Sequence, residues 1–222
     1  MGAAAVLAVF VVGLLAGLLS GLVGVGGGVL MVPFLYFFYA RPGWSGIAPA
    51  AEVATVAAHA TSLFVILPTS LRGALAYHRL GLVVWRAVWP IGAAAAVAAA
   101  VASRFAAQLD PQWLRVVFAL FLLWNAANVL RRPRSRGKRP VGEEGHPNPH
   151  ALPHVPPLRL SLPVTTGVGA AVGVFSALLG VGGGLIALPL LMHVVRVDLR
   201  RAAATSLAVI MLTSLGGALA YM

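Results

Sequence analysis

The residues of this chain that could do chemistry are mostly serines, threonines and glycines, and they recur in two matching sets. Residues 17–35 read GLLSGLVGVGGGVLMVPFL and residues 173–191 read GVFSALLGVGGGLIALPLL, with ten of 19 positions identical at an offset of 156. Residues 60–78 and 204–222 share 14 of 19 positions at an offset of 144. Hydroxyl and backbone amide groups donate hydrogen bonds, so they suit an anion that is held loosely and released.

The glycine runs predict a break in a membrane helix in each half. Each glycine costs about 1 kcal/mol relative to alanine within a helix, and the helix-break prolines Pro33 and Pro189 follow closely. Non-helical backbone at membrane depth must be buried in protein or line a wet cavity, and paired breaks indicate a transporter's substrate site. For Gly13, Gly17 and Gly21, the four-residue spacing favours close helix packing instead.

The candidate anion site combines both glycine runs with the hydroxyls that recur near them and one cation. These substrate-binding candidates are Ser20, Gly24, Gly26, Gly27, Gly28, Thr61, Ser62, Thr69, Ser70, Arg72, Ser176, Gly180, Gly182, Gly183, Gly184, Thr205, Ser206, Thr213 and Ser214. Any one hydroxyl could simply bond a carbonyl of its own helix, and Arg72 could extend to the membrane surface. Recurrence in both halves is what favours a shared site.

Two ionisable residues are candidates for proton coupling. Glu52, Thr55, His59 and Ser62 have the spacing of one helix face. An ionisable group deep in a membrane costs at least ~2.5 kcal/mol, so Glu52 and His59 could carry protons. The alternatives are an interfacial glutamate and a packing histidine.

Composition places the chain in a membrane. Of its 222 residues, 60% are hydrophobic and 9% are charged, and the mean hydropathy is +0.93. Soluble domains carry about 25% charged residues, so a soluble enzyme is excluded. The chain has no cysteine, which excludes disulfides and thiolate metal sites. Prolines interrupt the histidines of residues 146–154, so no metal site is predicted, and no cofactor or catalytic motif is recognised.

Six apolar runs are long enough to approach a ~30 Å bilayer crossing. They cover residues 3–23, 50–67, 82–103, 113–130, 160–179 and 202–221, with shorter runs at 29–40 and 185–195. The predicted fold is all-α, a polytopic transmembrane bundle built from two homologous repeats with glycine-interrupted helices. Residues 1–130 form the first repeat with four spans, 131–159 a basic, proline-rich linker, and 160–222 the second repeat with two spans.

The net charge of +11 is an orientation signal. Six of the 16 basic residues lie within residues 131–139, so no nucleic-acid partner is expected. Basic loops stay in the cytoplasm, which places the linker and the N-terminus on that side of a multi-pass protein.

The repeated pattern G-x2-S-x3-G-V-G-G-G-x4-P, followed each time by A-T-S-L, resembles the sulfite exporter TauE/SafE family of membrane permeases. The resemblance implies movement of small sulfur-containing anions, such as sulfite, sulfonates or sulfoacetate, across the bacterial inner membrane without ATP. The matching motif positions are Ser20, Gly24, Gly26–Gly28 and Pro33, and Ser176, Gly180, Gly182–Gly184 and Pro189.

The functional hypothesis is therefore a secondary anion permease that works by alternating access between the repeats, in contact with the bilayer. The alternative is a non-transporting membrane scaffold or assembly subunit whose glycines serve packing, and a homo-oligomer is compatible with either. The second repeat stops one residue after Tyr221, whereas the first continues through two more spans. A complete second repeat would add on the order of 50 residues, so we expect the chain to be a fragment.

Overall fold

The computed structural model of the chain describes residues 3–23, 27–40, 51–131, 161–195 and 197–221. Within them, the side chains of 3–5, 19–23, 40, 51–53, 125–126, 128–131 and 194–195 lie outside the description. All regular structure in the described residues is helical, which confirms the all-α class. The elements are α1 (Ala3–Val23), α2 (Gly28–Ala40), α3 (Ala51–Arg79), α4 (Trp85–Ala106), α5 (Pro111–Arg131), α6 (Leu162–Leu179), α7 (Gly184–Leu190), the π-helical turn η1 (Leu191–Val195) and α8 (Leu199–Tyr221).

Each predicted apolar run forms a helix, and α3 differs most from its predicted bounds. The apolar run stops at residue 67 because Pro68, Thr69 and Ser70 follow, yet the helix continues to Arg79. The hydroxyls of Thr69 and Ser70 donate to carbonyls of the preceding turn, the kind of bonding that lets membrane helices tolerate proline. A polar sequence can therefore lie inside a long helix.

Four helices in the described part of the chain are long and apolar enough to cross a membrane. They are Ala54–Arg79, Trp85–Ala106, Leu162–Leu179 and Leu199–Tyr221. By contrast, α2 has 13 residues, about 20 Å, which is too short for a crossing. The chain is thus a multi-pass membrane protein with short helices beside its spans.

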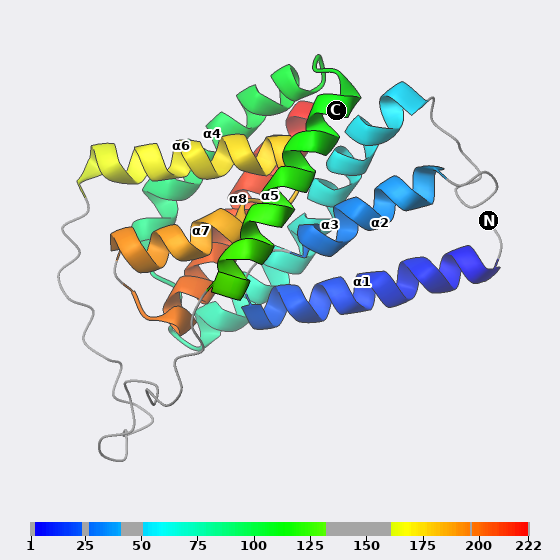
Figure 1. Cartoon of the computed structure of the whole chain (residues 1–222). Coiled ribbons are helices and arrows are strands. Elements are labelled where there is room, and N and C mark those ends of the chain that lie inside the picture. Colours follow the sequence, from blue (N-terminus) through cyan, green and yellow to red (C-terminus); the bar gives the residue numbers. More distant parts are fainter. Residues whose placement is uncertain (1–2, 24–26, 41–50, 132–160, 196, 222) are drawn as a thin grey trace.

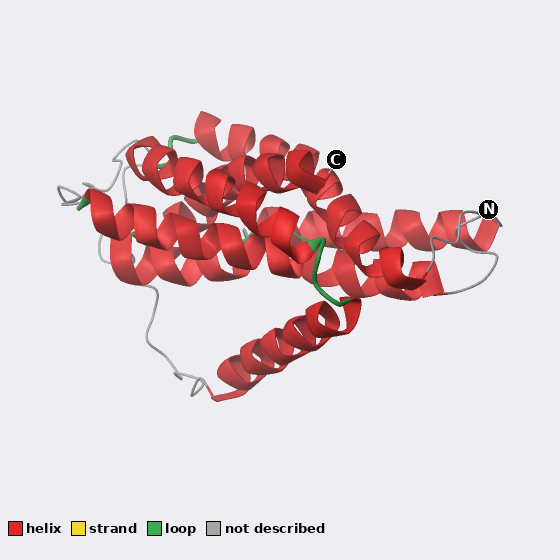
Figure 2. Cartoon of the chain, turned by 90° about the horizontal axis from the view of Figure 1, so that it is seen from above, coloured by secondary structure: helices red, strands yellow, loops and turns green. Residues whose placement is uncertain are grey.

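The centre of the bundle is α8, which packs against α3 and α4, while α6 lies along α4 (Figure 1). Ten consecutive residues of α8, 201–210, are buried. α1 lies at the edge of the bundle, and α5 is inclined away from the other helices (Figure 2). The predicted linker, 131–159, lies almost entirely outside the described residues, so the domain boundaries stay predictions.

Glycines bring α6 and α4 into close contact. A Cβ on Gly169 would lie 2.3 Å from the carbonyl oxygen of Ile91, and one on Gly173 would lie 2.2 Å from that of Ala95. Both neighbours are backbone atoms, which cannot rotate away. The two helices therefore need glycine at both positions.

We expect Gly173→Ala to destabilise the protein by about 1–3 kcal/mol, since relief of the overlap must move one helix. The measurement is the midpoint of thermal unfolding in detergent. Gly167→Ala is the matched control on α6, because no atom of the described residues lies within 4 Å of a Cβ there. Equal midpoints for the two variants would show that the α4–α6 contact tolerates a side chain.

Close packing was also predicted for Gly13 and Gly17 of α1, and there it is wrong. Nothing in the described residues lies within 4 Å of a Cβ on either glycine. Their counterparts at the offset of 156 are Gly169 and Gly173, which α4 covers. The same glycine spacing thus packs a helix only where another helix lies against it. Gly21 lies among residues whose side-chain surroundings are not described.

Candidate functional site

The two glycine runs interrupt their helices and meet each other inside the protein. α1 ends at Val23 and α2 begins at Gly28, while α6 ends at Leu179 and α7 begins at Gly184. A Cβ on Gly28 would lie 2.5 Å from the Cα of Val181, which belongs to the other break. We call Gly27 and Gly28, the described residues of the first glycine run, the first break, and residues 180–183 the second break. Their contact joins two segments that are far apart in the sequence.

The second break has a backbone that only glycine adopts readily. The φ angles of Gly180, Gly182 and Gly183 are 64°, 74° and 77°, in the left-handed region. Gly180 also caps α6, because its N–H donates to the carbonyl of Ser176 at 2.9 Å. Gly27 of the first break has a similar φ of 67°.

Side chains from α3 and α8 hold the second break in place. The Ser62 hydroxyl donates to the carbonyl of Gly180 at 2.8 Å, and the Thr213 hydroxyl donates to that of Gly182 at 3.0 Å. A Cβ on Gly182 would also lie close to Ile66 of α3 and Ile210 of α8. Non-helical carbonyls at this depth are thus satisfied by buried hydroxyls.

Two further hydroxyls at the second break have no hydrogen-bond partner among the described residues. Ser176 and Ser214 are both fully buried. A Cβ on Gly183 would lie 3.3 Å from the Cβ of Ser176, and one on Gly182 would lie 3.3 Å from the Oγ of Ser214. Buried polar groups are nearly always bonded, so two buried hydroxyls without a partner at one break are unusual.

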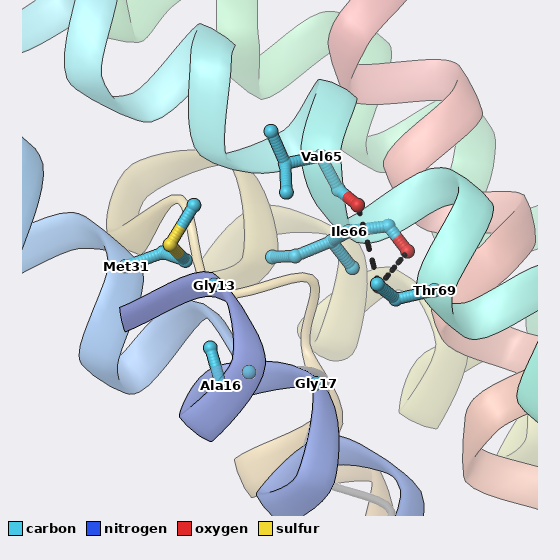
Figure 3. Close-up of a pocket in the computed structure, with 8 residues that line it drawn as sticks. Gly13, Ala16, Gly17, Met31, Val65, Ile66 and Thr69 are labelled. Atoms are coloured by element: carbon cyan, nitrogen blue, oxygen red, sulfur yellow. Dashed lines mark hydrogen bonds between the residues drawn. The ribbon is translucent and has the colours of Figure 1, made fainter. Parts of the chain in front are cut away.

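A groove lies at the first break, between α1, α2 and α3 (Figure 3). Its cavity volume is about 20 Å³, which is room for little more than a water molecule. Its lining residues are Gly13, Ala16, Gly17, Gly27, Met31, Val65, Ile66 and Thr69. Thr69 brings the one hydroxyl of this lining, and that hydroxyl bonds the carbonyls of Val65 and Ile66 on its own helix.

The second break is closed at the equivalent position. Ala16 of the groove corresponds to Val172, whose Cγ1 would lie 2.7 Å from a Cβ on Gly183. Thr69 corresponds to Thr213, which bonds across to the break. Val172 therefore occupies the space that Ala16 leaves open in the first half, and Thr213, which bonds its own helix as Thr69 does, also bonds the second break.

His59 lies against the second break, on the same helix as Ser62. Its ring is fully buried, its Nε2 lies 2.5 Å from the hydroxyl of Tyr36, and its Nδ1 has no partner among the described residues. A Cβ on Gly180 would lie 2.9 Å from the ring. The side chain of the other proton-coupling candidate, Glu52, is not described.

The remaining predicted residues lie in several environments. Thr61 bonds the hydroxyl of Tyr39 at 3.3 Å, Ser70 and Ser206 bond carbonyls of their own helices, and the Thr205 hydroxyl accepts from the N–H of Val84 at 3.2 Å. Arg72 is exposed on α3, Pro33 lies within α2, Pro189 lies within α7, and Gly184 is the buried first residue of α7. Gly24, Gly26 and the side chain of Ser20 lie outside the described residues.

The structure thus brings together part of the predicted set. The residues at the two breaks are Gly27, Gly28, Ser62, Thr69, Ser176, Gly180, Gly182, Gly183, Thr213 and Ser214. Tyr36 and Arg115, which adjoin this region, were not predicted. The other residues were predicted because they recur in both halves of the chain, and neither Tyr36 nor Arg115 does so. Among the described side chains, no three histidines or carboxylates gather as metal ligands.

Comparison with known proteins gives one family and several relatives. The family described as Sulfite exporter TauE/SafE matches residues 9–222. A probable membrane transporter protein of Methanocaldococcus jannaschii is 28% identical over 217 residues, which cover 96% of this chain and 70% of that protein. The probable membrane transporter protein YunE of Bacillus subtilis is 27% identical over 222 residues, covering 96% and 76%. No solved structure matches the chain significantly.

Proposed function

Because the chain belongs to the sulfite exporter TauE/SafE family of membrane proteins, we propose that it is a secondary permease for small sulfur-containing anions. Sulfite, sulfonates and sulfoacetate are the proposed substrates, and the bacterial inner membrane is the proposed location. The curated relatives are named probable membrane transporters, which supports transport rather than catalysis.

The observation that carries the proposal is the pair of unpartnered hydroxyls at the second break. Ser176 is buried beside Gly183 and Ser214 beside Gly182, and neither has an acceptor among the described residues. A buried donor without an acceptor costs about 1–3 kcal/mol. An oxyanion with several acceptor oxygens would satisfy both hydroxyls at once, and a neutral apolar ligand would satisfy neither.

The contact between the breaks supports a mechanism of alternating access. Gly28 lies directly against Val181, so a movement of one break must displace the other. The first break has an open groove at Gly27, while Val172 and Thr213 close the equivalent space at the second break. We propose that transport exchanges these two arrangements by rocking one repeat against the other.

His59 and Glu52 are the proposed proton carriers. His59 is buried against Gly180, so a change in its protonation would alter the surroundings of the second break directly. The proposed orientation keeps the N-terminus and residues 131–159 in the cytoplasm. A homo-oligomer is compatible with this proposal, and nothing in it requires one.

Flux into proteoliposomes tests the proposal. We expect saturable uptake of radiolabelled sulfite above that of protein-free liposomes, faster with an imposed proton gradient and competed by sulfonates. Gly183→Leu should abolish it, because even a Cβ there would meet Val172 and Ser176 and the φ of 77° disfavours a side chain. Absence of uptake by the wild-type protein would favour the non-transporting scaffold. Full uptake by Gly183→Leu would show that transport does not depend on the second break.

A further inference from the structure

A line of polar contacts leads from the side of the bundle to the second break. Arg115 of α5 donates from Nε to the hydroxyl of Thr55 at 2.8 Å, and its guanidinium carbon lies 5.7 Å from the ring centroid of Tyr36. Tyr36 pairs with His59, and His59 lies against Gly180. The line therefore joins α5, α3 and α2 to the break between α6 and α7.

The outer end of this line carries a positive charge in a fixed position. A guanidinium has five N–H donors in a planar fork, and the Thr55 hydroxyl occupies one of them. Contact with the face of Tyr36 further restricts its orientation. Arg115 is nevertheless exposed, so donors remain available on its outer side.

The acidic side chains that the structure describes are engaged elsewhere. Asp198 pairs with Arg201 at 3.7 Å, and the Asp110 carboxylate accepts the N–H of Gln112 at 2.8 Å, where it caps the start of α5. Neither forms an ion pair with Arg115. Glu52, whose side chain is not described, lies one turn before Thr55 on α3 and is therefore included in the test below.

The inner end of the line has a free polar atom. His59 is fully buried, and its Nδ1 has no partner among the described residues. When the Tyr36 hydroxyl donates to Nε2, the proton of the neutral ring lies on Nδ1, which then becomes a buried donor without an acceptor. This unpaired group, between Arg115 and Gly180, is a second and independent indication that an anion binds along the line.

We propose that Arg115 is the anion-selecting residue at the entrance to the second break, with Thr55 and Tyr36 as positioning residues that hold its guanidinium. The ligand is a small oxyanion, because a planar fork binds two oxygens of a sulfonate or sulfite group in parallel. The line of contacts continues from Arg115 through Tyr36 and His59 to Gly180 of the second break, where Ser176 and Ser214 also lie. The inference rests on the proposed transport function and adds the residue that selects the transported anion.

The test is the concentration dependence of sulfite flux. We expect Arg115→Gln to raise KM by about tenfold or more with little change in the maximal rate, since one charged contact of the entering anion is lost. Arg115→Lys keeps the charge without the planar fork of donors, so KM should return only part of the way to the wild-type value. Thr55→Val, which removes the acceptor for Nε, should raise KM by a smaller factor. Glu52→Gln removes a proposed proton carrier and should lower the maximal rate without raising KM.

Arg104→Gln is the matched control. Arg104 is an exposed arginine in the last turn of α4, which the short segment 107–110 joins to the start of α5. The Arg104→Gln substitution removes the same positive charge as Arg115→Gln, near the same end of the bundle. Equal KM values for Arg115→Gln and Arg104→Gln, or full recovery by Arg115→Lys, would overturn the role of Arg115 and leave the transport proposal intact. No flux in the wild-type protein would overturn both.

Discussion

Gly28→Ala is expected to reduce sulfite transport by about fivefold or more, because the added methyl group would push the two breaks apart. A Cβ at this position would lie 2.5 Å from the Cα and 2.9 Å from the carbonyl carbon of Val181. Both are backbone atoms, so the overlap is relieved only by moving a break. Overpacking of this kind costs about 1–3 kcal/mol, and about 1.4 kcal/mol in a barrier is tenfold in rate.

The initial rate of sulfite uptake at matched protein content measures this effect. Gly167→Ala, whose Cβ would meet no described residue within 4 Å, serves as the control and should transport like the wild type. A Gly28→Ala protein with an unchanged rate and an unchanged unfolding midpoint would show that the breaks do not depend on their contact.

Removing both unpartnered hydroxyls should abolish transport without destabilising the protein. In the Ser176→Ala/Ser214→Ala variant, no hydrogen bond to a described residue is lost, so the unfolding midpoint should stay constant or rise. A hydrogen bond to a charged group contributes about 1.5–3 kcal/mol, and the loss of two such bonds to a bound anion reduces transport by over about a hundredfold.

The matched control is Ser62→Ala, which should destabilise the protein. The Ser62 hydroxyl is bonded to the carbonyl of Gly180, so Ser62→Ala should lower the free energy of unfolding by about 1 kcal/mol. Comparing the unfolding midpoints and the sulfite flux of the two variants separates binding from packing. A double variant that is destabilised yet transports normally would contradict the proposed role of Ser176 and Ser214.

Local chemistry made the breaks predictable. Consecutive glycines weaken a helix wherever they occur, so the ends of α1 and α6 and the starts of α2 and α7 follow from the sequence alone. Recurrence between the halves also pointed to Ser176 and Ser214. The extension of α3 beyond Pro68 was missed because its polar residues bond within their own helix, which a search for apolar runs does not recognise.

Properties that depend on distant neighbours were not predictable from local patterns. Gly13 and Gly17 have the same spacing as Gly169 and Gly173, yet the first pair lines the groove, with no described atom within 4 Å of a Cβ, and the second pair packs against α4. Arg115 meets Thr55 across 60 residues of sequence. The spacing of residues within one helix cannot show which other helix will lie against it.

The central claim is that the meeting point of the two glycine breaks binds a small anion. Equilibrium binding of radiolabelled sulfite to the purified protein tests it most directly, because binding is separated from the movements of transport. We predict saturable binding that sulfonates compete for, that Gly167→Ala retains, and that Ser176→Ala/Ser214→Ala loses. No saturable binding to the folded wild-type protein, or undiminished binding to the double variant, would contradict the claim.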